Sequence, residues 1–437
     1  MLSKEDNEAL TQVGPGTPMG ALMRLYWLPF LPSADLVADG PPVRVRLLGE
    51  DLVAYRGSDG AISLVDHACP HRRAPMLFAR NEECGLRCVY HGWKFDASGA
   101  VVDMPAEPAR SRFKEKVRIT AYPCRERNGV AWTYMGDAKK LLPLPNFEWN
   151  MVPAENVVVT LRVQECNWLQ ALEGEIDSAH APILHGRVDD RGAINQWRSA
   201  RDLRPLFDCV RQDFGVSIAS RRASEGDQVY WRINQFVMPF YTLVPPQSKF
   251  PELSGHAWVP IDDAHTLCLM FSYHPARPMW EKSRQVFLDG HNGRESGHAS
   301  RHAYEPKSPM EPYARYWTRY NRANAYRFHY AEHATWSSGL PGLWVQDAAC
   351  QSGVEPVCDR TREHLGMSDS GIAATRRCLL GHLRALRESG EPPPRIADPD
   401  LYMVRAASLR LAKDVSWVEA GAQHIRARLG EDFGYEP

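Results

Sequence analysis

The sequence predicts an α+β protein, in which an all-β domain is followed by a larger domain of mixed strands and helices. Short alternating runs of apolar and polar residues, separated by Gly and Asp, fill residues 41–150. Longer strand-like runs and helix-like periodic runs are mixed through residues 151–437. We therefore predict three parts, which are an N-terminal helical segment over residues 1–40, the all-β domain over 41–150, and the mixed domain with its C-terminal helices over 151–437.

Local signals mark the N-terminal segment and the all-β domain. The first part contains the turn signal Gly14-Pro15-Gly16 and an apolar segment, Met19 to Leu31, that we expect to form a short helix. The strands of the β domain are expected at the runs Val43–Leu48, Leu52–Tyr55 and Val130–Tyr134. We assign no chemistry to the first 40 residues.

The mixed domain is expected to contain a curved antiparallel sheet beside helices. Its strand-like runs are Val229–Ile233, Phe236–Met238 and Thr266–Tyr273. Residues 275–335, which are rich in Arg, His, Glu, Ser and Tyr, have the composition of a long excursion or lid. A helix capped by Ser368 or Asp369 should run to about Leu386, and a last helix is expected near Glu419 to Leu429.

Composition limits the class of protein. The 437 residues, 44% hydrophobic and 24% charged, are enough for two or three domains with ordinary cores. The formal charge of −1 lacks the basic excess of nucleic-acid-binding proteins. The sequence has no run of about 18 apolar residues, so we expect no membrane span. Its N-terminus is acidic and lacks a continuous apolar run, so we expect no export. Ten scattered cysteines without a disulfide framework favour reduced thiols and the cytoplasm.

The stretch from Asn167 to His185 places two imidazoles and a carboxylate close together in the sequence. At about 100° per residue it predicts an amphipathic helix with Asp177 and His180 on its polar face. On a regular helix His185 would lie about 140° away from His180, and Pro182 can break the helix so that His185 folds back. Two imidazoles and a carboxylate are the ligands of non-haem Fe(II) oxygenases, so a distant Asp or Glu would complete the site. The alternative is that both histidines are structural.

A second group of metal-binding residue types lies in the β domain. Cys69-Pro70-His71 is followed after 16 residues by Cys88-Val89-Tyr90-His91. In a Cys2His2 zinc finger both cysteines precede both histidines, whereas here each loop offers one thiolate and one imidazole. This order suits a [2Fe–2S] cluster in which two cysteines hold one iron and two histidines hold the other. Zinc or a metal-free structural site is the alternative.

These motifs resemble those of one enzyme family. Cys69–Arg72 and Cys88–Phe95 are similar to the Rieske motif of aromatic ring-hydroxylating oxygenases, and Asn167–His185 is similar to the segment that carries two iron ligands in the same enzymes. Respiratory Rieske proteins carry extra cysteines in both loops, where this chain has Arg72 and Val89. The resemblance implies one [2Fe–2S] Rieske cluster, and a mononuclear Fe(II) in a catalytic domain of the helix-grip type.

Further segments are similar to the phthalate-dioxygenase-like branch of that family, and the resemblance covers nearly the whole chain. They are Pro18–Gly20, Gln346-Asp347, Asp359–Asp369, Arg376-Arg377 and Asp398–Tyr402. The branch hydroxylates aromatic carboxylic acids or removes methyl groups from methoxyaromatic acids. The resemblance therefore implies a terminal (alpha) oxygenase component, a mono- or dioxygenase, that acts on a phthalate-like or lignin-derived methoxyaromatic acid.

The same resemblance implies the ligands of the mononuclear iron. His180 and His185 match the two histidine ligands, and Asp347 is the best match for the third. Asp359 and Asp369 are the rival candidates. Asp359 lies in a charged run typical of a surface ion-pair loop, and Asp369 has the sequence context of a helix cap.

Two further residues are predicted to be catalytic, Asp177 and Asn167. Asp177 matches the carboxylate that, in the family, links an iron-ligand histidine to a cluster histidine of the neighbouring subunit within a ring of three. Here it would link His180 to His91 of the next chain. The alternative for Asp177 is an ordinary solvated acid on a helix.

The electrons must come from elsewhere. We find no Gly-rich dinucleotide motif after a strand and no plant-type ferredoxin cysteine spacing. We therefore expect a separate reductase, with or without a ferredoxin, so that NAD(P)H acts only indirectly and O2 is the cosubstrate. By resemblance the chain forms a homotrimer or stacked trimers, and we expect no nucleic-acid or membrane partner.

An acidic substrate would need a cation in its binding site, and Arg can grip a carboxylate at two points. The weak candidates for this anchor are Arg198, Arg201, Arg204 and Arg232. An apolar wall could come from Phe236, Met238, Phe240 and Tyr241, although core packing is the simpler role for them. Two other classes of protein stay open at this stage, a Rieske electron-transfer protein without oxygenase chemistry and a non-catalytic scaffold.

Overall fold

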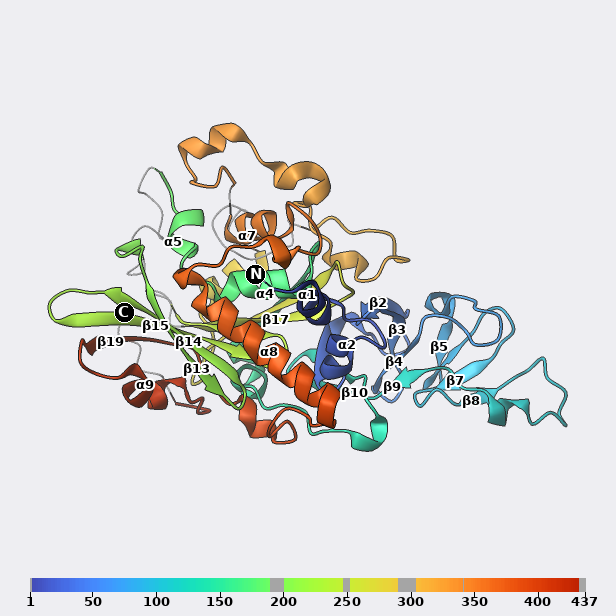
Figure 1. The fold of residues 1–437 in the computed structure, drawn as a ribbon. Coiled ribbons are helices and arrows are strands. Elements are labelled where there is room, and N and C mark those ends of the chain that lie inside the picture. Colours follow the sequence, from blue (N-terminus) through green and yellow to red (C-terminus); the bar gives the residue numbers. More distant parts are fainter. Residues whose placement is uncertain (1, 189–199, 247–251, 290–303, 341, 432–437) are drawn as a thin grey trace.

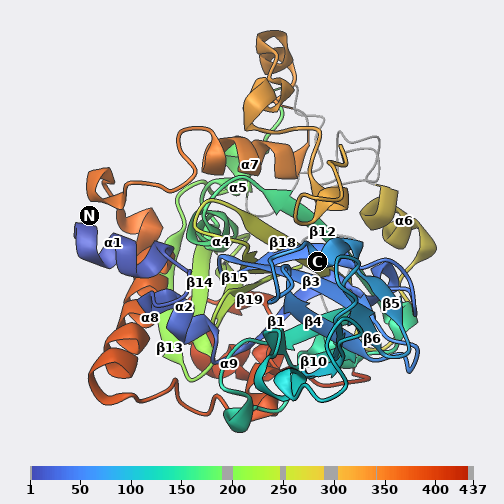
Figure 2. The same cartoon turned by 90° about the vertical axis from the view of Figure 1, so that its right-hand side faces the viewer.

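The computed structural model describes residues 2–188, 200–246, 252–289, 304–340 and 342–431. One large antiparallel sheet with helices packed on it forms the bulk of the molecule, and smaller antiparallel sheets extend from one side of it (Figure 1). In Figure 2 this smaller part lies in front of the large sheet. The predicted α+β architecture is confirmed.

Two four-stranded sheets form the outer part of the β domain. The first contains, in spatial order, β2 (Val43–Leu47), β3 (Glu50–Arg56), β4 (Ile62–Asp66) and β9 (Ala121–Tyr122). The second contains β5 (Arg80–Glu82), β6 (Gly85–Arg87), β7 (Lys94–Asp96) and β8 (Val101–Asp103). The strands expected at 43–48 and 52–55 are present. A hydrophobic core separate from that of the large sheet holds the two sheets together, and it includes Val53, Tyr55, Trp93 and Phe95.

A three-stranded sheet joins this part to the rest of the chain. Its order is β1 (Trp27–Pro32), β11 (Val130–Tyr134) and β10 (Cys124–Arg127). The helix expected over Met19–Leu31 is wrong in its second half, because α2 covers only Pro18–Met23 and a strand follows; α1 (Lys4–Thr11) precedes both. Pro29 lacks the N–H that a helix needs, whereas an edge strand such as β1 tolerates it.

The large sheet is antiparallel throughout. Its order is β12 (Val157–Gln164), β18 (Thr266–Tyr273), β17 (Leu253–Pro260), β16 (Tyr241–Val244), β15 (Gln228–Val237), β14 (Gly215–Ala223) and β13 (Leu206–Gln212), and β19 (Ala407–Ala412) also pairs with β15. The expected strands at 229–233 and 266–273 are present, and the run at 236–238 continues β15 to Val237.

One face of this sheet, which we call the inner face, lies under α4 (Trp168–Ile176). Cross-strand pairing places Ser220, Arg232, Asn234, Thr242 and His256 on it, because paired residues and every second residue along a strand share a face. Its contact with the chain above is direct: Asn234 Nδ2 donates a hydrogen bond to the carbonyl of Glu175 at 3.3 Å. The opposite face packs against α9 (Trp417–Ile425) through Trp231 and Ile233.

The remaining helices lie on both faces and at the edges of the sheet. They are α3 (Glu148–Met151), α5 (Ala181–Leu184), α6 (Glu281–Asp289), α7 (Leu343–Ser352) and α8 (Ser370–Ser389). The helices expected near 368–386 and 419–429 correspond to α8 and α9. The long α8 crosses the front of the sheet in Figure 1.

The predicted central helix is wrong at its C-terminal end. α4 stops at Ile176, Asp177 has an extended backbone at ψ 110°, and His180 therefore lies beyond the helix. Pro182 does not break a helix there; it lies in the first turn of α5, where its missing N–H has no partner to lose. Two short helices with a bend between them thus carry the residues that we expected on one.

Part of the excursion expected at 275–335 is ordered structure. It contains α6 and short 3-10 helices at Ala314–Tyr316, Arg322–Arg327 and Tyr330–Ala334, whereas 290–303 lie outside the described residues. The described helices include none that is long and apolar enough to span a bilayer.

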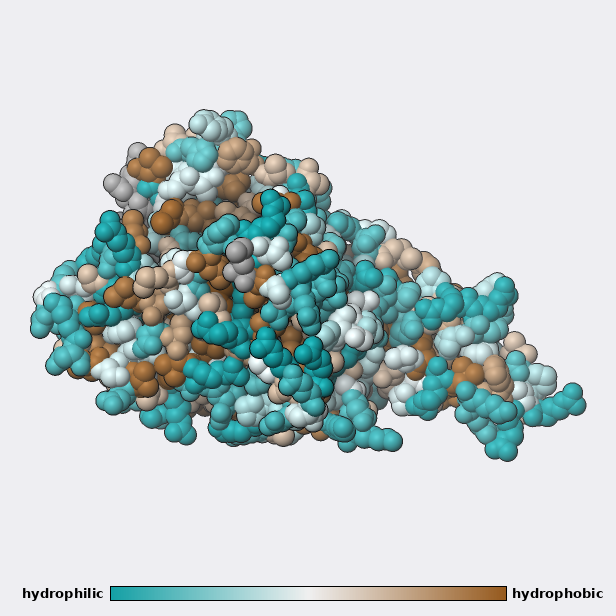
Figure 3. All heavy atoms as spheres, in the orientation of Figure 1, coloured by the Kyte–Doolittle hydropathy of each residue, from teal (hydrophilic) through white to brown (hydrophobic). Residues whose placement is uncertain are grey.

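In Figure 3 hydrophilic side chains dominate the visible surface at the outer end of the β domain.

Candidate functional site

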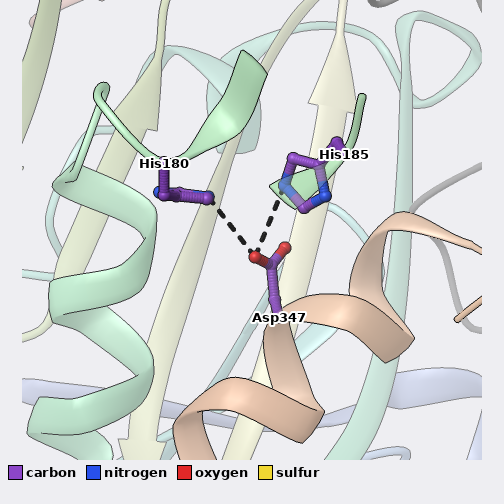
Figure 4. Close-up of side chains that lie close together, drawn as sticks. All are labelled: His180, His185 and Asp347. Carbon is purple, nitrogen blue, oxygen red and sulfur yellow. Dashed lines mark ion pairs between the residues drawn. The ribbon is translucent and has the colours of Figure 1, made fainter. Parts of the chain in front are cut away.

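Three side chains that are far apart in the sequence converge between α4, α5 and α7. His180 Nε2 and His185 Nε2 each lie 3.4 Å from Asp347 Oδ1, and one ligand atom from each residue lies within 4.8 Å of the others. Figure 4 shows the Asp347 carboxylate, which extends from α7, directed toward both rings. We call these residues the triad. Its donor set, two imidazoles and one carboxylate, fits a divalent iron with open coordination positions.

Two neighbouring side chains hold the imidazoles in the orientation that a metal needs. Asp177 Oδ2 lies 3.3 Å from His180 Nδ1, and Gln346 Oε1 lies 2.7 Å from His185 Nδ1. Because a carboxylate and an amide oxygen can only accept, each Nδ1 donates the hydrogen bond, and each Nε2 is directed toward the centre of the triad, where it can bind a metal. Gln346 is itself fixed, since its Nε2 donates to the carbonyl of Leu340 at 2.6 Å.

The charges at the triad favour a cation at its centre. Burial acts to lower the pKa of His180, but the carboxylates of Asp177 and Asp347 raise it to about 10. Burial acts to raise the pKa of Asp347, yet His185 and His180 hold it below its usual value. The side chains of His180 and Asp347 remain 24% and 28% exposed, so one side of the triad stays open to a small molecule.

Helix α4 directs three consecutive positions at three different neighbours. Glu173 binds two buried arginines, Arg376 of α8 with Nε at 2.5 Å and Arg360, which precedes α8, with Nη2 at 3.0 Å. Gly174 faces α7, where a Cβ would lie 2.0 Å from Gln351 Nε2. Glu175 faces the sheet, and its Oε1 lies 3.2 Å from Nδ1 of His256 on β17.

The contact at Gly174 brings the third ligand into place. Gln351 and Asp347 are four residues apart on α7 and so lie on the same side of that helix. Because residue 174 has no side chain, α7 can approach α4 closely on that side. The Gln351 side chain is fixed by Gln164 of β12, whose Nε2 donates to its Oε1 at 2.5 Å.

Asn167, predicted to be catalytic, lies at the start of α4, at the opposite end from Asp177. Its Oδ1 accepts from the N–H of Leu169, and its Nδ2 donates to the carbonyls of Thr11 and Asp263 at 2.9 and 2.7 Å. These are the contacts of a helix cap that joins α4 to the N-terminal segment. A catalytic role for Asn167 stays a prediction without a contact to the triad.

The rival acids lie elsewhere. Asp359 caps a short helix, with Oδ1 accepting from the N–H of Thr361 at 3.1 Å. Asp369 lies at the start of α8 and accepts from the N–H of Gly366. Among the described residues, only Asp347 joins the two histidines in a group of potential metal ligands.

The predicted cluster ligands lie on two short loops between strands of the β domain. Cys69 and Cys88 are buried, and the loop bonds Arg73 N–H to Cys69 O at 2.9 Å and Gly92 N–H to Cys88 O at 3.0 Å give both loops the same turn. The rings of His71 and His91 are 4.4 Å apart. Burial, with Cys88 adding to it, raises the pKa of Cys69 to about 11, so a bound cation is needed to make the thiolate.

Aromatic and cationic side chains surround these loops. Trp93 stacks on His71 with ring centres 4.5 Å apart, and Arg72 lies over the Tyr90 ring. Gly92 has φ 75°, and a Cβ there would lie 2.6 Å from Pro105. The donor set of two thiolates and two imidazoles on adjacent loops therefore fits a [2Fe–2S] cluster.

The structure separates the four candidate substrate anchors. Arg201 is 59% exposed and pairs with Glu225, Arg204 is exposed, and Arg198 lies outside the described residues. Arg232, by contrast, is 4% exposed on the inner face, and its Nη1 is buried without a hydrogen-bond partner.

The expected apolar wall is part of the main core instead. Phe236, Met238, Phe240 and Tyr241 are all buried there, and Tyr241 packs on Phe147 with ring centres 4.4 Å apart. The simpler role that the sequence offered for these residues, core packing, is the one that their contacts match.

Sequence reasoning missed three residues that the structure places beside the site. Gln346 and Glu175 adjoin predicted site residues, so their position was the available signal. Arg222 had no signal; it is 1% exposed, and its Nη2 donates to the carbonyl of Ser178 at 2.6 Å, which holds the segment between Asp177 and His180.

Two family models match the chain. A model described as a Rieske [2Fe-2S] domain matches residues 26–123, and a model described as LigXa C-terminal domain like matches residues 133–433. The first contains the four predicted cluster ligands, and the second contains the triad.

Three proteins that are similar to nearly the whole chain are all named as oxygenase subunits. The 3-chlorobenzoate-3,4-dioxygenase oxygenase subunit of Comamonas testosteroni is 36% identical over 97% of this chain and 99% of its own. The phthalate 4,5-dioxygenase oxygenase subunit of Pseudomonas putida is 34% identical over 100% and 99%. The 5,5'-dehydrodivanillate O-demethylase oxygenase subunit of a Sphingobium strain is 31% identical over 91% and 84%.

A solved structure supports the fold. The terminal oxygenase of carbazole 1,9a-dioxygenase from Novosphingobium sp. KA1 superimposes with a TM-score of 0.55 at 20% identity, covering 87% of this chain and 95% of its own. The arrangement of a small β domain beside a large sheet with helices is therefore one that is known from solved structures.

Proposed function

This chain belongs to the Rieske oxygenases, as a terminal oxygenase of the phthalate-like branch with a Rieske cluster and a mononuclear iron, and on that premise we propose that it hydroxylates or O-demethylates an aromatic carboxylic acid. The observation that carries the proposal is the triad, in which His180, His185 and Asp347 present three ligand atoms within 4.8 Å. An electron carrier without oxygenase chemistry would not need this second site.

Each metal site has its own residues in this proposal. Cys69, His71, Cys88 and His91 hold the cluster, and the triad holds the iron. When bound, the cluster delivers single electrons and the iron activates O2. Gln346 and Asp177 each accept a hydrogen bond from Nδ1 of one triad histidine, which directs the Nε2 atom of that ring toward the iron position.

The substrate carboxylate is proposed to bind at Arg232. Its guanidinium is buried, forms no ion pair with the described residues, and carries an unpartnered Nη1. Ser220, its partner on β14, contacts Ser178 with 3.1 Å between the hydroxyl oxygens, which places Arg232 below the segment between Asp177 and His180. Burial, together with the positive charge of Arg232, lowers the pKa of Arg222 to about 10, so this part of the inner face favours an anion.

We propose a ring of three chains in which Asp177 links His180 to His91 of the next chain. The cluster loops lie in the part of the molecule that extends away from α5 and α7 (Figure 1), so a neighbour could bring its cluster to this triad. The relatives are named oxygenase subunits, so we propose that separate electron-transfer proteins supply the electrons. That a reductase using NAD(P)H is the first donor, with or without a ferredoxin, is part of the proposal.

We also propose a cytoplasmic location. All ten cysteines are free in the structure, which suits a reducing compartment. Fractionation of the cells that produce the protein tests this.

A single-turnover experiment tests the proposed reaction without the unidentified donor. Iron-loaded protein is reduced chemically under anaerobic conditions and then exposed to O2 with phthalate, 3-chlorobenzoate or 3-methoxybenzoate. We expect a hydroxylated or demethylated product from at least one acid. Oxidation of the cluster without any organic product would support the electron-carrier alternative.

A further inference from the structure

The ion pair between Glu175 and His256 has no role in the proposed reaction so far. Glu175 Oε1 lies 3.2 Å from His256 Nδ1, and the two side chains are only 20% and 11% exposed. We propose that His256, oriented by Glu175, is a second recognition point that binds an oxygen substituent of the aromatic ring other than the carboxylate at Arg232. This rests on the proposed function and adds the substitution pattern of the substrate.

The pair faces the same interior as the triad. Glu175 lies on the last turn of α4, and its charge acts on His185, while the charge of Asp347 acts on Glu175. On the sheet, His256 is the β17 partner of Thr242, which in turn pairs with Phe236 of β15. His256 therefore shares the inner face with Arg232, two strands away.

Three contacts fix the His256 ring. It stacks on Trp258 with ring centres 4.8 Å apart and 23° between the planes, and Trp258 is held by its Nε1, which donates to Thr242 Oγ1 at 2.9 Å. The Glu175 carboxylate lies against Nδ1 as an ion-pair partner, without the alignment of a hydrogen bond. Burial opposes ionisation of Glu175, but the charge of His256 nevertheless lowers the pKa of Glu175, so the pair is held together by charge.

The remaining ring nitrogen is the binding atom. Nε2 makes no hydrogen bond to any residue that the structure describes, whereas Nδ1 faces the Glu175 carboxylate and the ring stacks on Trp258. Asn234, nearby on the inner face, has an unpartnered buried Oδ1 as well. The inner face below the triad thus carries one cation, Arg232, and two polar groups without hydrogen-bond partners, on His256 and Asn234. Because unpaired buried polar atoms are costly, this face suits a ligand with more than one polar substituent.

The alternative is a purely structural role, in which the Glu175–His256 pair only joins α4 to β17. Binding measurements separate the two roles, because a structural contact affects all ligands alike whereas a recognition point discriminates among them. The probes are benzoate, with a carboxylate only, and 3-hydroxybenzoate and phthalate, each with a second oxygen substituent. Dissociation constants are measured by calorimetry on iron-loaded protein without O2.

We expect the unmodified protein to bind 3-hydroxybenzoate or phthalate at least about tenfold more tightly than benzoate, as one buried hydrogen bond allows. His256→Phe should abolish this preference while changing the benzoate constant by less than about twofold. Glu175→Gln, which keeps an acceptor for Nδ1 but removes the charge, should reduce the preference in part. If 3-hydroxybenzoate binds more tightly than benzoate, Nε2 binds a hydroxyl. If phthalate does, Nε2 binds a carboxylate.

Two controls guard against misreading the result. His265 forms a comparable pair with Asp262 at 2.9 Å, on the turn between β17 and β18, and His265→Phe should leave the preference unchanged. Arg232→Gln should weaken all three probes together. His256→Gln, which keeps a hydrogen-bonding group, replaces His256→Phe if the latter does not fold, and should retain part of the preference.

The outcomes are distinct. Equal binding of all probes by the unmodified protein, or an equal loss for all probes in the His256 variants, overturns this inference and leaves the proposed function intact. If no aromatic acid binds, the proposed function fails and the inference fails with it.

Discussion

The four predicted cluster ligands lie within residues 69–91, whereas the three residues of the triad are spread over residues 180–347. In the β domain each loop closes on itself through backbone hydrogen bonds, and its own turn positions the ligands. At the triad the ligands come from the bend after α4, the end of α5 and the middle of α7, and their distances depend on how these helices pack. A local site of this kind withstands changes elsewhere in the chain, whereas an assembled site is sensitive to each helix contact.

The largest expected effect separates the two sites completely. Asp347→Ala should remove the mononuclear iron and abolish product formation, while about two irons and two sulfides per chain remain in the cluster. Cys88→Ser should do the reverse. Iron and sulfide analysis with EPR after reduction checks both. Loss of the cluster in Asp347→Ala would show that the sites do not form independently.

Asp177→Asn probes the connection between the sites. The amide keeps a hydrogen-bonding group near His180 but loses the negative charge, so both metals should stay bound while turnover falls by about 10- to 100-fold. The rate of cluster oxidation after O2 exposure measures electron transfer directly. Unchanged turnover would contradict the proposed bridge to His91 of the next chain.

Gln346→Leu tests whether the orientation of a ligand matters. Without the amide, His185 Nδ1 loses its 2.7 Å acceptor and the ring is free to turn or to change tautomer. We expect iron affinity to fall by about tenfold, with the cluster unaffected. Competition with a chelator provides the measurement, and Gln346→Glu, which keeps the acceptor, should retain most of the affinity.

Gly174→Ala tests the helix contact behind the triad. The new methyl would collide with the amide of Gln351, so this side chain must leave its hydrogen bond with Gln164 or α7 must shift, at a cost of about 1–3 kcal/mol in unfolding free energy and with weaker iron binding. Gly381→Ala in α8 is the matched control, because nothing lies within 4 Å of its Cβ position and Ala stabilises a helix by about 1 kcal/mol relative to Gly. Thermal or urea unfolding compares the two; equal effects would refute the contact argument.

The smallest effect is expected at Arg201. Its guanidinium is 59% exposed and pairs with a glutamate that is 83% exposed, so Arg201→Ala should change stability by less than about 1 kcal/mol and leave KM for an aromatic acid unchanged. Steady-state kinetics beside Arg232→Gln shows the contrast. A raised KM in Arg201→Ala would mean that the substrate site extends to the surface beside β14.

The same contrast explains what could be predicted from the sequence. The four cluster ligands could be predicted from the sequence because each Cys and His pair lies within one short loop. The triad needed more: His180 and His185 are close in sequence, but Asp347 could be chosen over Asp359 and Asp369 only by resemblance, since nothing in the sequence tells which acid a helix packing will bring to the histidines.

Other features depended on tertiary contacts in a similar way. The periodicity of the central segment continued past Ile176, yet the helix ends there because the bend that follows is stabilised by Asp177, which accepts from the N–H of Ala179, and by Arg222. The four arginines proposed as substrate anchors were not ranked against one another from the sequence. An arginine inside the apolar run Val229–Ile233 was the available signal, because a charged residue within a buried strand requires a special environment.

The three-way packing of α4 also bears on how the enzyme can change. With Glu173 tied to two buried arginines, Gly174 pressed against α7 and Glu175 tied to β17, no residue in this turn is free to vary without disturbing a different neighbour. A mutant library intended to shift the range of accepted aromatic compounds would therefore lose most of its members if it randomised α4. Diversity is better placed at those positions of β15, β16 and β17 that face the triad without such ties, because the strands supply a rigid frame there.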